Sequence, residues 1–264
     1  MENKFRSIEQ SNPEFGTKNL RFITVKSQNL KGRGDICMYV PEQCPVDVPV
    51  VILLHGVYGS AWSWPLSSGV HEQVDNAIKA GTIKPMVLLM PSDGLWGDGS
   101  GYVKHKELNF EKWIVEDCIQ AAKQVLPENI TGKSKFFIAG LSMGGYGAMR
   151  LGIRHPELFS AFSGLSSITS IPEFEHFVEE NLELYQEDKD LALIDSFIAN
   201  RKNLQPFRFD CGKDDILIEY NRKLHSQLLE ANINHTYEEF EGGHSWDYWK
   251  NNILKTILFF NLQL

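Results

Sequence analysis

Short apolar segments alternate along the chain with longer segments in which apolar residues recur every three or four positions. The short segments predict buried strands, at residues 48–54, 85–90, 135–139 and 206–211, with a further, alternating strand at 234–240. The longer segments predict amphipathic helices, at residues 110–126, 216–229 and 246–260. This order of elements predicts an α/β fold, with a mostly parallel central sheet and helices on both faces.

One segment, residues 170–203, departs from this alternation because it is helical in character and rich in acidic residues. Its carboxylates include Glu173, Glu175, Glu179, Glu180, Glu183, Glu187, Asp188 and Asp190. Such a run is typical of a solvated helical insertion. It can also be a lid over an active site, and both interpretations can hold together. No repeat or linker interrupts the chain, so we expect a single domain over 1–264.

Composition narrows the class of protein. The chain has 264 residues, 42% of them hydrophobic, and a net charge of −8. An acidic surface disfavours nucleic acid and anionic membranes as partners. No apolar run is long enough to cross a bilayer or to act as a secretory signal, so we expect a cytoplasmic protein. The spacing of the four cysteines predicts free thiols and no metal site, at Cys37, Cys44, Cys118 and Cys211.

A serine between glycines, Gly140-Leu141-Ser142-Met143-Gly144, follows the predicted strand 135–139. A serine on a sharp turn from a strand to a helix exposes its hydroxyl only if the flanking residues are very small. The motif alone occurs by chance in about one chain in ten. The alternative is a glycine-rich helix start with a purely structural use. The strand before it and the helix after it favour Ser142 as a nucleophile.

Acyl transfer also needs backbone N–H groups aimed at the carbonyl oxygen that becomes negatively charged. Met143 directly follows the serine and is the first expected donor. The second should come from the glycine-flanked turn after strand 48–54, where we favour Val57 and keep Tyr58 as the alternative. The sequence His55-Gly56 can equally mark no more than the end of a strand.

A serine hydroxyl requires a histidine as general base and a carboxylate that orients the histidine. His244 lies in the flexible loop Gly242-Gly243-His244, whereas the other histidines lie in or beside predicted elements. Asp214 and Asp215 follow strand 206–211, at the edge of a parallel sheet where sites form. One of these two carboxylates is the expected acid.

Several motifs together resemble the Putative esterase family of the α/β-hydrolase superfamily, which includes esterase D, feruloyl and acetylxylan esterases and the antigen 85 acyltransferases. The resemblance rests on Leu54-His55-Gly56, Gly140 to Ala148, His155-Pro156-Glu157-Leu158-Phe159, Cys211 to Asp215 and Gly242 to Trp246. It implies an α/β-hydrolase fold with a small helical insertion. It also favours Asp215 over Asp214 as the acid and Val57 as the second N–H donor.

The same resemblance separates this chain from one subgroup. The S-formylglutathione hydrolases carry a cysteine-containing loop where this chain has Val57-Tyr58-Gly59-Ser60. That departure disfavours formylglutathione as the substrate. The loop around His244 is more similar to esterases of short-chain and carbohydrate esters.

Candidate substrate-binding residues follow the predicted strand 85–90. Trp96 and Tyr102 are expected to stack on a sugar or an aromatic acid, and Asp98 or Asp93 to accept hydrogen bonds from hydroxyls. The alternative is an ordinary flexible loop. Trp62 and Trp64 follow the oxyanion turn and are either core residues or the wall of an acyl pocket.

The function that these expectations support is a serine carboxylic-ester hydrolase that works through an acyl-enzyme intermediate. Its substrate is expected to be a small-molecule or carbohydrate ester, either short-acyl or carbohydrate-linked, and no metal or organic cofactor is expected. A thioesterase of the S-formylglutathione hydrolase type, or an acyltransferase, is the alternative with the same chemistry. An alternative of another class is a non-catalytic ligand-binding protein with this fold.

Overall fold

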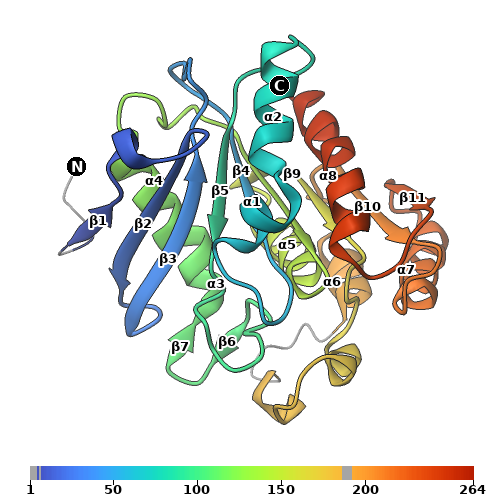
Figure 1. The fold of residues 1–264 in the computed structure, drawn as a ribbon. Helices are drawn as coiled ribbons and strands as arrows, with labels where there is room; N and C mark the ends of the chain where they lie inside the picture. The colour runs from blue at the N-terminus through green and yellow to red at the C-terminus, as the bar shows by residue number, and fades with distance from the viewer. Residues whose placement is uncertain (1–4, 6, 186–191) are drawn as a thin grey trace.

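A nine-stranded sheet runs through the computed structural model, which describes residues 5, 7–185 and 192–264 (Figure 1). The strand order is β1-β2-β3-β5-β4-β8-β9-β10-β11. The bounds are β1 (Ile8–Gln10), β2 (Leu20–Ser27), β3 (Gly32–Tyr39), β4 (Val50–Leu54), β5 (Val87–Pro91), β8 (Phe136–Leu141), β9 (Phe159–Leu165), β10 (Phe207–Gly212) and β11 (Thr236–Phe240). A separate antiparallel pair joins β6 (Lys104–His105) to β7 (Leu108–Asn109).

The sheet is parallel from β5 to β11 and antiparallel at its other edge. Strands β5, β4, β8, β9, β10 and β11 all run in one direction. Strands β1, β2 and β3 pair antiparallel, and β3 pairs antiparallel with β5. The predicted mostly parallel sheet is confirmed. Because the parallel strands end at the same edge, the loops that follow them meet there.

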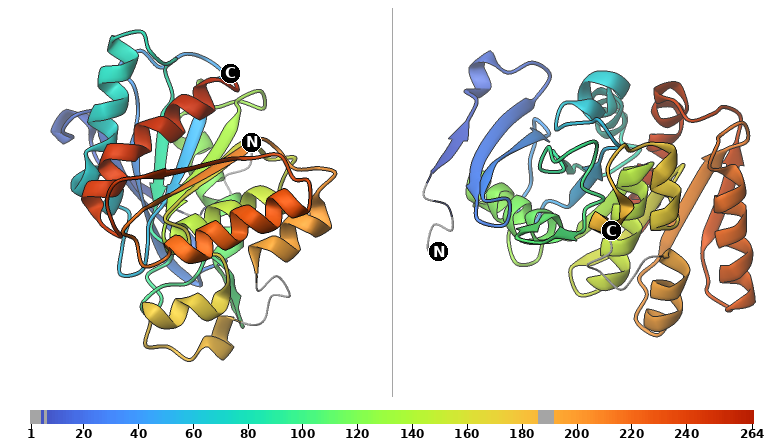
Figure 2. Two further views of the ribbon diagram at one scale, coloured as in Figure 1. Left: turned by 90° about the vertical axis from the view of Figure 1, so that its right-hand side faces the viewer. Right: turned by 90° about the horizontal axis from the view of Figure 1, so that it is seen from below.

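Helices cover both faces of the sheet, as the view from below shows (Figure 2, right). One face carries α1 (Ser63–Ser68), α2 (Val70–Lys79) and α8 (Trp246–Asn261). The other carries α3 (Phe110–Lys112), the π-helix η2 (Trp113–Cys118), α4 (Ile119–Val125), α5 (Met143–Arg154), α6 (Leu193–Asn200) and α7 (Ile218–Glu230). Within the described ranges, no helix is both long and apolar enough to cross a bilayer.

Strand β4 explains why the buried strands are continuous apolar runs. Val50, Ile52 and Leu54 pack into the core on one face of the sheet, and Val51 and Leu53 pack into the core on the other. All five side chains are fully buried. A strand with helices on both sides has no solvent face, so it shows no alternation of polar residues.

The insertion is anchored in the protein rather than solvated on all sides. A β-bridge joins Ser170, at its start, to Ala192. The described part of the insertion contains the 3-10 helices η3 (Ile171–His176) and η4 (Leu182–Tyr185) and the helix α6. Phe174 and Tyr185 are fully buried. Glu175, Glu179 and Glu183 are exposed as expected, whereas Glu187, Asp188 and Asp190 lie outside the described residues.

Glu173 contradicts the expectation of an exposed acidic face. Its side chain is buried, and its carboxylate accepts hydrogen bonds from the backbone N–H and hydroxyl of Thr169 and from the hydroxyl of Ser170. Burial raises the pKa of Glu173, and these hydrogen bonds oppose the rise. This carboxylate therefore fixes the start of the insertion, which directly follows the loop after β9.

Candidate active site

Ser142 occupies the sharp turn between β8 and α5. Its backbone has φ 53° and ψ −119°, a conformation that a non-glycine residue rarely adopts. The glycines on either side make this turn possible. A Cβ at Gly140 would lie 2.1 Å from the carbonyl oxygen of Gly144, and one at Gly144 would lie 2.4 Å from the carbonyl oxygen of Leu54. Neighbouring backbone atoms therefore leave no room for a side chain at Gly140 or Gly144, which explains why the sequence motif needs very small residues there.

A chain of hydrogen bonds joins Ser142, His244 and Asp215, which follow β8, β11 and β10. The Oγ atom of Ser142 lies 3.0 Å from Nε2 of His244. Nδ1 of His244 lies 3.0 Å from both carboxylate oxygens of Asp215, which is buried and also accepts the Leu217 N–H. Asp214 is exposed. The structure thus places Asp215 beside the histidine, as the resemblance implied.

Val57 lines the same cleft as Ser142, and Met143 directly follows the serine; these residues carry the two favoured oxyanion donors. For the backbone N–H groups of Val57 and Met143, no hydrogen-bond acceptor is found in the part of the chain that the structure describes. The N–H of Tyr58 donates instead to the carbonyl of Asp98 at 2.8 Å. The structure therefore favours Val57 over Tyr58 as the second donor, because the Tyr58 N–H already has a partner.

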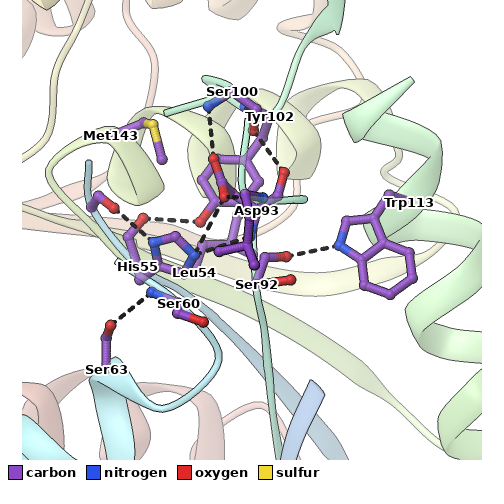
Figure 3. Close-up of polar contacts among 12 residues, drawn as sticks. Leu54, His55, Ser60, Ser63, Ser92, Asp93, Ser100, Tyr102, Trp113 and Met143 are labelled. Carbon is purple, nitrogen blue, oxygen red and sulfur yellow. Dashed lines mark hydrogen bonds and ion pairs between the residues drawn. The ribbon is translucent and has the colours of Figure 1, made fainter. Parts of the chain in front are cut away.

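His55 holds the turn that carries Val57 (Figure 3). Its Nε2 atom accepts the Asp93 N–H at 3.0 Å, so Nδ1 carries the proton and donates to the carbonyl of Gly56 at 2.6 Å. Burial lowers the pKa of His55 by more than the nearby carboxylate of Asp93 raises it, which keeps the ring neutral. The hydroxyl of Tyr102 donates to the carbonyl of His55. His55 thus does more than end a strand.

Two residues expected to bind substrate serve this network instead. Tyr102 has no exposed surface, so it cannot stack on a sugar. Asp93 is buried, and its carboxylate accepts the N–H groups of Leu95 at 2.9 Å and Ser100 at 2.7 Å. Figure 3 shows both side chains beside His55. Sequence reasoning placed this loop on the correct edge of the sheet but misassigned these side chains.

Asp98 and Trp96 also differ from expectation. One carboxylate oxygen of Asp98 accepts the backbone N–H of Glu179 at 2.7 Å, so this side chain binds the insertion. Trp96 packs against His105, with ring centroids 4.2 Å apart, and lies edge-on to Tyr185. It lines a separate hollow beside β6 and η4, not the cleft that contains Ser142.

A cleft of about 490 Å³ opens above Ser142. Trp62 is half-exposed on its wall, whereas Trp64 is buried and donates its indole N–H to the carbonyl of Leu54. Of the two positions considered for these tryptophans, Trp62 thus lies on the cleft wall and Trp64 lies in the core. The described lining contains no Asp, Glu, Lys or Arg: it consists of Gly56, Val57, Tyr58, Gly59, Trp62, Ser63, Ser67, Leu141, Ser142, Phe177, His244, Ser245, Trp246 and Trp249.

Aromatic side chains enclose the histidine. Phe177 stacks on the His244 ring at 5.2 Å, Trp249 meets it edge-on at 5.0 Å, and Trp246 packs edge-on against Trp249. Phe177 lies in the acidic insertion and was not predicted as a site residue from the sequence. The only feature of the sequence that points to Phe177 is its spacing from Phe174 among charged residues. The same spacing is expected when a helix simply packs against the core.

Comparison with known proteins identifies the class. A family model described as Putative esterase matches residues 27–260. An acetyl esterase from Caldicellulosiruptor saccharolyticus is 29% identical over 227 residues, 78% of this chain and 81% of that relative. An endo-1,4-beta-xylanase/feruloyl esterase from Xylanibacter ruminicola is 33% identical over 130 residues, 47% of this chain and 17% of that protein.

The solved structure of a ferulic acid esterase matches with a TM-score of 0.79 at 20% identity, covering 98% of this chain and 99% of that chain. The fold is thus that of the α/β-hydrolases, as expected, and the protein is a carboxylic-ester hydrolase. The chain belongs to the Putative esterase family.

Proposed function

We propose that the protein hydrolyses esters through an acyl-enzyme intermediate on Ser142, with His244 as general base and Asp215 as the orienting acid. The observation that carries this proposal is the unbroken contact chain from Ser142 Oγ through both nitrogens of His244 to the buried carboxylate of Asp215. A hydroxyl is a weak nucleophile at neutral pH until a base takes its proton as it attacks. This geometry supplies that base.

The reaction has two halves in this account. Ser142 Oγ attacks the ester carbonyl while its proton passes to Nε2 of His244, and the carbonyl oxygen becomes an oxyanion that the Val57 and Met143 N–H groups stabilise. The oxyanion collapses, the bond to the alcohol breaks, and the alcohol leaves with the proton from His244. Water then attacks the acyl-serine in the same way, which releases the carboxylic acid and restores Ser142.

The cleft favours an uncharged ester with a short acyl group or a flat aromatic acyl group. Its described lining has no cationic side chain, so nothing there pairs with the carboxylates of a glutathione leaving group. Trp62, Trp246 and Phe177 offer aromatic surface of the kind that packs on sugar rings or arenes. The relatives named as acetyl and feruloyl esterases support acetyl or feruloyl esters of carbohydrates as the substrate class.

The test compares wild type with Ser142→Ala on p-nitrophenyl acetate, methyl ferulate, acetylated xylan and S-formylglutathione. We expect turnover of the oxygen esters to fall by at least about a thousandfold in the variant, with S-formylglutathione the poorest wild-type substrate. Unchanged turnover in the variant would refute the nucleophile. A preference for S-formylglutathione would refute the substrate class and favour the thioesterase alternative.

A further inference from the structure

The turn that carries Val57 has a second support on its outer side, formed by the short segment 97–99. Tyr58 N–H donates to the carbonyl of Asp98 at 2.8 Å. Gly99 packs against both proposed oxyanion residues, since a Cβ there would lie 2.4 Å from Sδ of Met143 and 3.3 Å from Cγ1 of Val57. A shift of segment 97–99 would therefore change the contacts of both residues that carry the proposed N–H donors, Val57 and Met143.

The insertion in turn holds segment 97–99 by three hydrogen bonds. The N–H of Asp98 donates to Oε1 of Glu180 at 2.8 Å, and its carboxylate accepts the Glu179 N–H at 2.7 Å. The hydroxyl of Tyr185 donates to the carbonyl of Gly99 at 2.6 Å. Asp98 thus binds the insertion through its N–H and carboxylate and binds the oxyanion turn through its carbonyl.

Tyr58 makes a direct bond between the same two regions. Its hydroxyl donates to the carbonyl of Phe177 at 2.9 Å, and Phe177 is the residue that stacks on His244. The backbone of Tyr58 has φ +58°, a strained conformation that persists only where surrounding contacts fix it. The residue is 67% exposed, so burial does not account for this conformation.

We propose that Tyr58 and Asp98 form a clamp that couples the insertion to the oxyanion turn, so that the Val57 N–H is aimed correctly only while the insertion is docked. This inference rests on the proposed function. Both are positioning residues: neither side chain contacts the reacting atoms, and each acts through Val57. In this account the insertion supports catalysis by holding the oxyanion turn, in addition to providing a wall of the cleft.

The experiment uses Tyr58→Phe, which removes the hydroxyl that donates to the Phe177 carbonyl and also interacts with the Asp98 carboxylate, and Asp98→Ala, which removes the acceptor of the Glu179 N–H. Tyr220→Phe is the matched control, because Tyr220 also contacts the insertion through its hydroxyl, 3.0 Å from Nε2 of His176, but has no contact with the oxyanion turn. Asp98→Asn keeps an acceptor oxygen and tests rescue.

Misplacement of an oxyanion donor weakens transition-state binding more than substrate binding. We therefore expect kcat for p-nitrophenyl acetate to fall about fivefold in Tyr58→Phe and in Asp98→Ala, with KM within about twofold of wild type. Asp98→Asn should recover most of the loss, and Tyr220→Phe should match wild type. Hydrogen exchange should quicken in peptides covering both 56–60 and 177–180 in Tyr58→Phe.

Three outcomes would overturn the clamp: Tyr58→Phe indistinguishable from Tyr220→Phe in kcat, a change in KM alone, or faster exchange confined to one of the two peptides. If the proposed function itself is wrong, the result is different: the wild-type protein shows no ester turnover that depends on Ser142. In that case the exchange measurement still decides whether the two regions are coupled.

Discussion

Phe177 stacks on the imidazole of His244, with ring centroids 5.2 Å apart and planes inclined by 28°. The contact brings the insertion into direct touch with the proposed general base. It also fixes one wall of the cleft, since Phe177 lines the space above Ser142. The insertion is thus part of the site in the conformation described.

Replacing Phe177 by leucine should keep most of the packing volume but remove the flat aromatic wall. We expect kcat/KM for methyl ferulate to fall about tenfold, which corresponds to one aromatic stacking contact, and the value for p-nitrophenyl acetate to fall less. Ile198→Ala is the control, because Ile198 is half-exposed on α6 and does not line the cleft. Equal losses on both esters would argue against a role of this wall in substrate selection.

Asp215→Asn should lower kcat by about a thousandfold to ten-thousandfold, because an amide cannot hold the required histidine tautomer or stabilise the imidazolium. Asp214→Asn is the matched control on the adjacent residue, whose side chain is exposed, and should retain activity within about twofold. Steady-state kinetics on p-nitrophenyl acetate distinguish the two. A larger loss in Asp214→Asn would reverse the assignment of the acid.

Trp62→Ala should raise KM for aryl esters about fivefold to tenfold while the melting temperature stays close to that of wild type. The reason is that Trp62 is 50% exposed on the cleft wall, so its loss removes substrate contact without opening a core cavity. Leu66→Ala is the control, since Leu66 is 65% exposed on α1 and outside the lining. A large drop in melting temperature would instead place Trp62 in the core.

Glu111 anchors the helix that follows Ser142. Its carboxylate lies 2.7 Å from Nη1 of the buried Arg150 and 2.9 Å from Nε2 of His155. Burial alone would raise the pKa of Glu111, but the hydrogen bond from His155 and the charges of Arg150 and Arg154 outweigh it and lower the pKa from 4.5 to about 2. That fall corresponds to about 3 kcal/mol of stability at neutral pH.

A carboxylate with a lowered pKa stabilises the fold above its unfolded pKa, and the contribution is lost as pH falls toward the folded value. Urea denaturation should therefore find Glu111→Gln less stable than wild type by about 3 kcal/mol at neutral pH. The difference should shrink by about 2 kcal/mol by pH 3, as wild type loses the contribution. A difference independent of pH would mean that the ion pair is not its source.

Much of the site could be predicted because each of its features depends on local sequence. The sharp turn at Ser142 requires very small residues two positions before and two positions after the serine, and Gly140 and Gly144 are visible there in the sequence. The acid and the histidine follow strands whose apolar runs are visible, and parallel strands bring their ends to one edge. The five predicted strands correspond to β4, β5, β8, β10 and β11. Four of them are buried along their whole length, whereas β11 is only partly buried and was predicted from its alternation. The buried strand β9 was not predicted because serines and a glycine interrupt its apolar residues.

The remaining features depend on contacts between distant segments. Asp98 was expected to bind substrate, but its carboxylate accepts the Glu179 N–H and its carbonyl accepts the Tyr58 N–H. No pattern of side chains in the sequence reveals these two contacts. The same holds for Asp93. The antiparallel strands β2 and β3 were missed because their faces are only partly buried and carry polar residues such as Lys26 and Asp35, so they lack the continuous apolar character of the parallel strands.

The central claim is that Ser142 becomes acylated, and covalent trapping tests it most directly. A fluorophosphonate should react with the native enzyme, and digestion followed by mass spectrometry should find the adduct on the peptide containing Ser142. His244→Ala should slow labelling by at least about a hundredfold, since the serine loses its base. Labelling at another residue, or none under conditions where wild type turns over p-nitrophenyl acetate, would contradict the account.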